Sequence, residues 1–241
     1  MSERLDKTLA SLGLVQSRSQ AESYIRLGKV KVAGKVVTKT GHMIHDPASV
    51  TLDQIEQYVS RAGLKLASVA GQFGVDFRDT IVLDVGSSTG GFTDYALKRG
   101  ARKIYAVEVG TNQLHPSLRG NERIELHEQT DIRDFTPDET PDIVVIDVSF
   151  ISLREILPHV AKISGPNTQI LAMVKPQFEA AASKLKHKGV IKNDRMRRDI
   201  LQDFEQWAKA SFLTKDKADS EVPGEKGNLE RFYVLQPIKK S

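Results

Sequence analysis

Cysteine is absent from the 241-residue chain, which excludes disulfide bridges and thiolate metal ligands. Long apolar runs are also missing, because no stretch approaches the ~18 apolar residues that a membrane-spanning helix requires. The first ten residues, MSERLDKTLA, are charged where a secretion signal would be apolar. The six histidines lack a metal-ligand spacing such as HExxH. We therefore expect a cytoplasmic protein with no metal site and no membrane partner.

The net charge is small, at +4, but it is unevenly distributed. Residues 1–41 hold five lysines and three arginines against three acidic residues, a net charge of +5, so the remainder of the chain sums to −1. A basic front segment ahead of a nearly neutral larger one indicates an electrostatic contact with a polyanion, such as a nucleic acid.

The front segment carries the start and stop signals of two short helices. Ser2 is expected to cap the first helix, which ends at Gly13. Ser17 followed by Gln20 predicts a capping box for the second helix, and Gly28 supplies its end. The residues expected on the buried faces are Leu5, Leu9 and Leu12 in the first helix and Ala21, Tyr24 and Ile25 in the second.

A basic hairpin is expected to follow these helices. Val30 and Val32 alternate with lysines before a turn at Ala33–Gly34, which predicts one packed face and one cationic face. The basic residues that we expect to contact RNA phosphates are Arg4, Arg18, Arg26, Lys29, Lys31 and Lys35.

The rest of the chain alternates apolar, β-branched runs with helix-length segments. The runs expected to be strands are 81–86, 103–109, 123–128, 142–148, 170–175 and 231–236. This pattern predicts an α/β fold of the Rossmann-like kind, with a mostly parallel sheet covered by helices on both faces. We place the boundary between a small front domain, residues 1–57, and a large domain, residues 58–241, near residue 58. In such sheets ligands bind beyond the carboxyl ends of the strands.

A glycine-rich loop follows the first of these runs, in DVGSSTGGFTD (84–94). It lacks both the GxGxxG dinucleotide signature and the GK[ST] ending of a phosphate loop. The next strand ends at Glu108, where a carboxylate can accept hydrogen bonds from both hydroxyls of a ribose. Together, the loop and the acid favour a cofactor that contains adenosine.

Two resemblances sharpen these expectations. Residues 4–41, with Arg4-Leu5-Asp6 and the Ile25-x-x-Gly28-x-Val30-x-Val32 run, resemble the small RNA-binding module of a small-subunit ribosomal protein, pseudouridine synthases and tyrosyl-tRNA synthetases. The glycine-rich loop with AVEVGTNQLHPSLR (106–119) resembles class I S-adenosylmethionine methyltransferases, and more closely the FtsJ-like ribose methyltransferases and the TlyA group, which are often labelled hemolysins.

The second resemblance implies a set of cofactor contacts. Asp84, Gly86, Ser88 and Gly90 would surround the methionine portion of S-adenosylmethionine. Glu108 would hold the ribose. The adenine would lie between Asp131 and Ile132, which follow the third strand.

The same resemblance implies four catalytic residues. Lys65 in SRAGLKL, Asp147, Lys175 in VKPQFE and Glu230 match the Lys-Asp-Lys-Glu tetrad of FtsJ-like 2′-O-methyltransferases. Lys175 would activate the ribose hydroxyl or accept its proton, and Asp147 would orient Lys175 and the cofactor. Lys65 and Glu230 would position the ribose. The resemblance thus implies methylation of ribosomal RNA, alone or in subunits, at a ribose that in the TlyA group belongs to a cytidine.

Two other functions remain open at this point. A membrane-damaging cytolysin would agree with the hemolysin label, although the chain lacks an apolar insertion segment. A non-catalytic RNA-binding protein with a decayed methyltransferase fold is the other alternative. A second basic cluster could face RNA or only solvent, and it comprises Lys184, Lys186, His187, Lys188, Arg195, Arg197 and Arg198.

Overall fold

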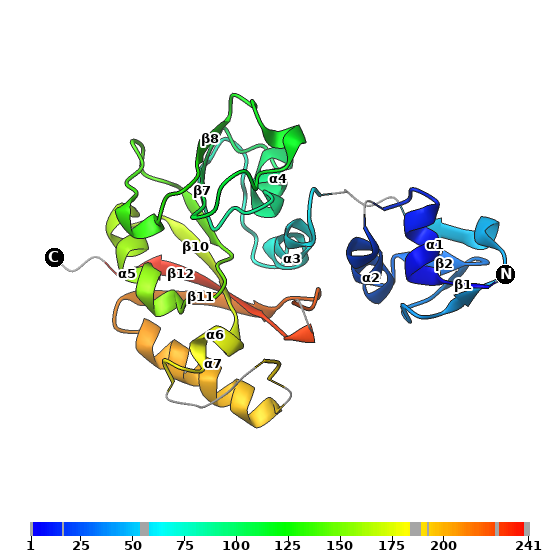
Figure 1. The fold of residues 1–241 in the computed structure, drawn as a ribbon. Helices are drawn as coiled ribbons and strands as arrows, with labels where there is room; N and C mark the ends of the chain where they lie inside the picture. Colours follow the sequence, from blue (N-terminus) through cyan, green and yellow to red (C-terminus); the bar gives the residue numbers. More distant parts are fainter. Residues whose placement is uncertain are drawn as a thin grey trace.

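The structure of the protein is a computed structural model that describes residues 2–15, 17–53, 58–183, 189–191, 193–224 and 227–238. Two groups of elements are visible along the chain (Figure 1). A small group at the N-terminal end contains two short helices and short strands, and a larger group surrounds one extended sheet.

The small group combines helices α1 (Leu5–Ser11) and α2 (Arg18–Arg26) with two small sheets. A three-stranded antiparallel sheet has the order β3-β2-β5, and a second pair joins β1 to β4. The strands are β1 (Glu3–Arg4), β2 (Val30–Val32), β3 (Lys35–Val36), β4 (Met43–Ile44) and β5 (Val50–Leu52).

The sequence signals of this group are mostly confirmed. Ser17 Oγ accepts a hydrogen bond from Gln20 N at 3.2 Å and so caps α2. Ala33 and Gly34 adopt the left-handed conformation (φ 48° and 77°) that the tight turn between β2 and β3 requires. Two expectations are wrong. The residue before α1 is Arg4 rather than Ser2, because Glu3 and Arg4 pair with β4, and Leu12 is 44 % exposed because α1 ends one residue before it.

The large group contains a seven-stranded sheet with the order β11-β12-β10-β9-β6-β7-β8. The five strands from β10 to β8 run parallel, whereas β12 is antiparallel to both β10 and β11. The expected α/β fold with a mostly parallel sheet is therefore confirmed. The strands are β6 (Ile81–Val85), β7 (Lys103–Val107), β8 (Ile124–His127), β9 (Ile143–Ile146), β10 (Gln169–Val174), β11 (Phe212–Asp219) and β12 (Arg231–Pro237). Strand β11 was not predicted, because exposed charged residues interrupt its apolar pattern.

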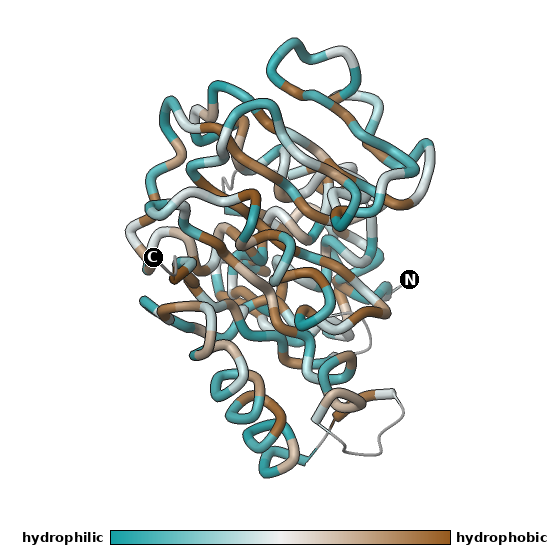
Figure 2. The backbone as a smooth tube through the Cα atoms, turned by 90° about the vertical axis from the view of Figure 1, so that its left-hand side faces the viewer, coloured by the Kyte–Doolittle hydropathy of each residue, from teal (hydrophilic) through white to brown (hydrophobic). Residues whose placement is uncertain are grey.

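Helices cover both faces of this sheet, and alternate side chains of each strand point to opposite faces. Val82 and Val145 pack in one core cluster with α3 and α4, whereas Leu83 and Val144 pack in another with α5 and α7. The hydrophobic segments accordingly run through the middle of the molecule (Figure 2). The helices are α3 (Arg61–Ala70), α4 (Gly91–Lys98), α5 (Leu153–Ile163), α6 (Pro176–Glu179) and α7 (Asp194–Ala208).

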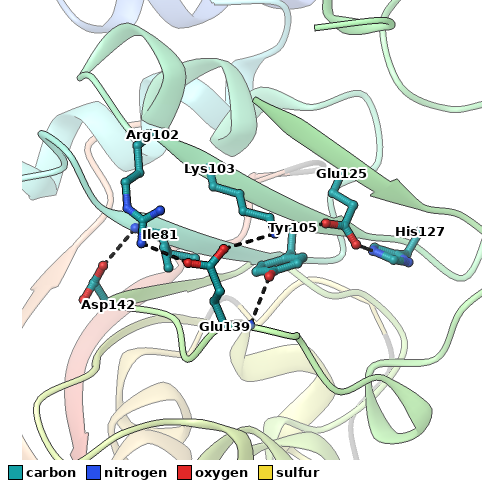
Figure 3. Close-up of polar contacts among 8 residues, drawn as sticks. All are labelled: Ile81, Arg102, Lys103, Tyr105, Glu125, His127, Glu139 and Asp142. Carbon is teal, nitrogen blue, oxygen red and sulfur yellow. Dashed lines mark hydrogen bonds and ion pairs between the residues drawn. The ribbon is translucent and has the colours of Figure 1, made fainter. Parts of the chain in front are cut away.

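The amino ends of the parallel strands are closed by polar contacts (Figure 3). Asp142 Oδ2 accepts a hydrogen bond from Ile81 N at 2.9 Å at the start of β6. Glu139 pairs with Arg102 at 3.1 Å, and its backbone N–H donates to the buried Tyr105 hydroxyl at 3.1 Å. These contacts connect the loop before β9 to β6 and β7. A ligand can bind at the opposite, carboxyl ends of the strands.

The order of the strands reverses between β6 and β9. From β6 the chain proceeds outward through β7 and β8, and it then returns to the other side of β6 with β9 and β10. Loops that leave two neighbouring strands in opposite directions open a crevice at the carboxyl ends of the strands. No helix within the described ranges is long and apolar enough to cross a membrane.

Candidate active site

All four residues expected to be catalytic line one cavity of about 570 Å³. Asp147 and Lys175 follow β9 and β10, so both lie at the carboxyl edge of the sheet. Glu230 directly precedes β12, and because β12 is antiparallel to β10 its start lies at the same edge. Lys65 reaches the cavity from α3.

The four residues form two short ion pairs. Lys175 Nζ lies 2.6 Å from Asp147 Oδ1, and Lys65 Nζ lies 2.6 Å from Glu230 Oε2. Lys175 Nζ also donates a hydrogen bond to Ser149 Oγ at 2.8 Å. Ser149 was not predicted, although its place two residues after Asp147 is a signal that could have identified it. The lysines and Glu230 are buried, so each charge depends on its partner for stabilisation.

The glycine-rich loop lies too close to its neighbours for larger residues at two positions. Gly86 has φ 78°, and a Cβ atom there would lie 2.9 Å from the Asp147 carbonyl oxygen. Gly90 has φ 88°, and a Cβ atom there would lie 2.5 Å from Leu118 Cδ1. Glycine is therefore required at both positions for backbone conformation and for space.

Asp84 is fully buried beneath this loop. Its Oδ2 accepts a hydrogen bond from Thr93 Oγ1 at 2.6 Å, whereas its Oδ1 has no hydrogen-bond partner within the described part of the chain. Burial raises the pKa of Asp84 to about 7. Ser87 Oγ is also buried without a partner among the described residues. Asp84 and Ser87 line a cavity of about 150 Å³, so unsatisfied polar atoms surround a space that a polar ligand group could enter.

The Glu108 carboxylate links the glycine-rich loop to the residues that follow β7. Its Oε2 accepts a hydrogen bond from Ser88 N at 2.9 Å, and its Oε1 accepts one from Gly110 N at 2.7 Å. Ser88 Oγ donates to Gln113 Oε1 at 3.1 Å, a contact that the sequence did not predict. Glu108, Ser88 and Gln113 line a cavity of about 390 Å³.

Asp131 and Ile132 lie on the other side of the same cavity. Ile132 is buried and offers an apolar wall. The Asp131 carboxylate accepts a hydrogen bond from Arg133 N at 2.9 Å and pairs with the Arg133 guanidinium at 2.6 Å. Asp131 is thus already engaged in the short 3₁₀ turn that follows β8.

The three cavities are adjacent, because Ser88, Asp147 and Ser149 line all of them. Phe150 stands at the entrance, where its side chain is 91 % exposed and its ring lies 5.2 Å from that of Phe178. In the parts of the chain that the structure describes, no group of histidine and carboxylate side chains is arranged to hold a metal ion.

In the small N-terminal group, Arg4 and Arg18 converge on one buried carboxylate. Asp6 Oδ1 lies 2.9 Å from Arg4 Nε, and Asp6 Oδ2 lies 2.6 Å from Arg18 Nη2. Burial opposes ionisation of Asp6, but the hydrogen bonds from both arginines outweigh it and lower the pKa of Asp6. The arginine side chains remain about half exposed, so Asp6 presents two guanidinium groups side by side.

The other residues expected to contact RNA differ in whether they are exposed or paired with an acidic residue. Arg26, Lys29 and Lys35 are exposed, whereas Lys31 pairs with Asp53 at 2.8 Å. In the second basic cluster, residues 184–188 lie outside the described residues. Arg197 of that cluster pairs with Asp219 and donates to Leu229 O at 3.1 Å, so it supports the segment that precedes Glu230.

Comparison with known families divides the chain into two matches. Residues 58–236 match the FtsJ-like methyltransferase family, and residues 3–47 match the S4 domain. The first match covers most of the chain and includes every residue of the three cavities.

Similar proteins extend over nearly the whole chain. Hemolysin A of Brachyspira hyodysenteriae is 39 % identical over 94 % of this chain and 97 % of its own length. The 16S/23S rRNA (cytidine-2′-O)-methyltransferase TlyA of Mycobacterium tuberculosis is 34 % identical over 97 % of this chain and 89 % of its own length. A solved structure of a hemolysin-named protein from Streptococcus thermophilus is 36 % identical, covers 99 % of this chain and 90 % of its own, and superimposes with a TM-score of 0.73.

Proposed function

The chain belongs to the FtsJ-like methyltransferase family and carries an S4 domain, and we propose that it is an S-adenosylmethionine-dependent ribosomal RNA methyltransferase that acts on a ribose 2′-hydroxyl. The TlyA relatives are rRNA (cytidine-2′-O)-methyltransferases, which favours cytidine as the target. The observation that carries the proposal is the convergence of Lys65, Asp147, Lys175 and Glu230 on one cavity beside the glycine-rich loop.

The residues of the two smaller cavities fit the proposed cofactor. Asp84 Oδ1 and Ser87 Oγ, which have no partner among the described residues, can bond the amino acid portion, next to Gly86, Ser88 and the turn at Gly90. Glu108 retains free lone pairs that can accept from ribose hydroxyls, and the adenine would contact the wall formed by Ile132 and Asp131. When bound, S-adenosylmethionine supplies a methyl group that its sulfonium already activates for displacement.

The chain's own task is to align the ribose hydroxyl and to manage its proton. We assign proton acceptance to Lys175, whose Nζ lies between Asp147 and Ser149 at the junction of the cavities. Asp147 orients the amine and stabilises its charge. The Lys65–Glu230 pair bounds the larger cavity and positions the ribose.

We assign RNA delivery to the small N-terminal group. Residues 1–57 would form the RNA-binding domain, and residues 58–241 would form the methyltransferase domain. The exposed cations Arg4, Arg18, Arg26, Lys29 and Lys35, together with Lys31, would bind backbone phosphates, which hold the protein on the RNA without reading its sequence.

The test is incubation with labelled S-adenosylmethionine and unmodified ribosomal subunits, followed by mapping of any methylated ribose. We expect label at a cytidine 2′-position with the wild type and none with Lys175→Ala. If neither subunit nor free ribosomal RNA takes up label although the protein binds RNA, the chain is a non-catalytic binder. Leakage of liposomes caused by the purified protein without cofactor would instead support a membrane-active function.

A further inference from the structure

Glu179 is a buried carboxylate to which the proposed reaction assigns no role. It ends α6, and the residue is 1 % exposed. Its Oε1 accepts a hydrogen bond from Leu153 N at 2.7 Å, and its Oε2 accepts one from Ser152 Oγ at 2.7 Å. Burial raises the pKa of Glu179, an effect that these two hydrogen bonds partly offset. A buried carboxylate is costly, so its partners indicate what it does.

Both partners lie directly after the loop that carries Asp147. Residues 148–151 alone separate Asp147 from Ser152, which is the N-cap of α5. Ser152 Oγ also accepts a hydrogen bond from Arg154 N at 3.2 Å. Glu179 therefore fixes the end of this loop by binding the first residues of the helix that follows it.

Lys175 lies one turn before Glu179 on the opposite segment. The Lys175 carbonyl oxygen accepts hydrogen bonds from Phe178 N at 2.9 Å and Glu179 N at 3.3 Å, so the backbones of Lys175 and Glu179 are held together. The Lys175 side chain then crosses to Asp147 and Ser149. Residues 147–153 and 175–179 are thus connected at both ends, by Lys175 at one end and by Glu179 at the other.

The middle of the loop is strained and lies beside the same segment. Phe150 has φ 66°, a left-handed conformation that is unfavourable for a residue other than glycine. The Phe150 ring packs against the Phe178 ring. Such a conformation persists where the surrounding contacts fix it, and the two anchored ends of the loop supply such contacts.

We propose that Glu179 is a positioning residue that holds Asp147 against Lys175 by anchoring the loop to the start of α5. This inference rests on the proposed roles of Lys175 and Asp147 in methyl transfer. Arg154 Nε lies 3.5 Å from Glu179 Oε2 and Arg154 Nη2 lies 2.7 Å from Asp203 Oδ2, so the cation beside Glu179 comes from α5 and not from the cavity.

The test compares three variants of the full chain. Glu179→Gln keeps the size of the side chain, but one of its two terminal atoms becomes a donor that cannot accept from Ser152 or Leu153. Ser152→Ala removes one of the two contacts and leaves the Leu153 contact. Glu155→Gln is the matched control, because Glu155 is exposed on the first turn of α5.

Two readouts separate positioning from general stabilisation. The first is kcat and KM with ribosomal subunits. The second uses cofactor-free protein and measures acetylation of Lys175 by acetic anhydride relative to the exposed Lys209. We expect Glu179→Gln to lower kcat by about 10- to 100-fold with little change in KM, because a small misplacement of reacting groups has such effects. Lys175 acetylation should increase several-fold, Ser152→Ala should show smaller changes in the same directions, and Glu155→Gln none.

Other outcomes would overturn the anchoring role of Glu179 or would separate it from the proposed methyl transfer. A lower melting temperature of Glu179→Gln with unchanged Lys175 acetylation would mean that Glu179 only stabilises α5, and it would overturn the inference. If Glu179→Gln does not fold, the acetylation of Lys175 in Ser152→Ala decides the question in the same way. If the wild type transfers no methyl group, the proposed function fails, whereas the acetylation comparison still tests the anchor.

Discussion

Lys175 and Asp147 lie on neighbouring parallel strands, β10 and β9, and their side chains meet 2.6 Å apart just beyond the carboxyl ends of both. Asp147 lines all three cavities, and Lys175 lines the largest and the smallest of them. A ligand in the smallest cavity and a second ligand in the largest one would therefore meet at this pair.

Replacement of Lys175 by alanine should slow methyl transfer without weakening the binding of cofactor or RNA. We expect Lys175→Ala to reduce kcat by about 10²- to 10⁴-fold, the usual contribution of a general base. The dissociation constants for S-adenosylmethionine and RNA should change little. Single-turnover methylation assays and binding titrations measure both, with exposed Lys209→Ala as the control. Undiminished single-turnover rates would remove Lys175 from the mechanism.

Glu108→Ala should weaken cofactor binding. The substitution removes the acceptor of Ser88 N and Gly110 N as well as the proposed ribose contact. Loss of a hydrogen bond to a charged group costs about 1.5–3 kcal/mol, which corresponds to an increase in Kd of about 10- to 100-fold. Isothermal titration calorimetry with S-adenosylmethionine measures it. Glu122→Ala, which removes an exposed carboxylate shortly before β8, should bind as the wild type does.

The stability of the cofactor-free protein should change with pH because Asp84 titrates. The pKa of Asp84 is about 7 in the folded protein and 3.8 ordinarily, so the folded state holds this proton more tightly than the unfolded state does. The contribution of Asp84 to the free energy of unfolding is therefore largest below pH 3.8 and falls as the pH rises towards 7.

Asp84→Asn cannot titrate, so its stability relative to the wild type should increase between about pH 5 and about pH 8. Urea unfolding at both pH values measures the difference. Parallel pH dependence of the two proteins would show that Asp84 is not the buried acid that the structure describes.

Removal of positive charges from the small N-terminal group should weaken RNA binding to a similar extent for all RNA sequences. We expect the triple variant Arg26→Gln, Lys29→Gln and Lys35→Gln to lower RNA affinity. The slope of log K against log salt should decrease by ~0.7–0.9 for each phosphate that the variant no longer neutralises. Cofactor affinity should remain unchanged. The control removes two exposed lysines elsewhere, Lys209 and Lys215. An equal fall in RNA affinity in this control would mean that the small N-terminal group contributes no more to RNA binding than other basic surfaces do.

The fold was predictable from the sequence wherever the pattern was strong. The central strands are apolar on both faces, and β6, β9 and β10 were anticipated within one or two residues. Strand β11 was not, because Phe212 is its one buried residue and the rest depends on pairing with β12. Ser2 likewise does not cap α1, because Glu3 and Arg4 separate it from the helix and pair with β4.

The candidate site was predictable for residues that directly follow parallel strands, because the topology brings those positions to one edge. Contacts made through side-chain packing were not predictable. Gln113 and Glu179 reach their partners only because segments distant in sequence fold against one another. Their residue types are too common at loop positions to signal a role in advance.

The Lys65–Glu230 ion pair joins residues that are 165 positions apart. Protein synthesis proceeds from the N-terminus, so α3 and the glycine-rich loop leave the ribosome well before β12 is made. Until β12 pairs with β10, Lys65 lacks its partner and the larger cavity lacks the wall that Glu230 provides. A nascent chain could therefore bind RNA through its front region before it has the means to modify it.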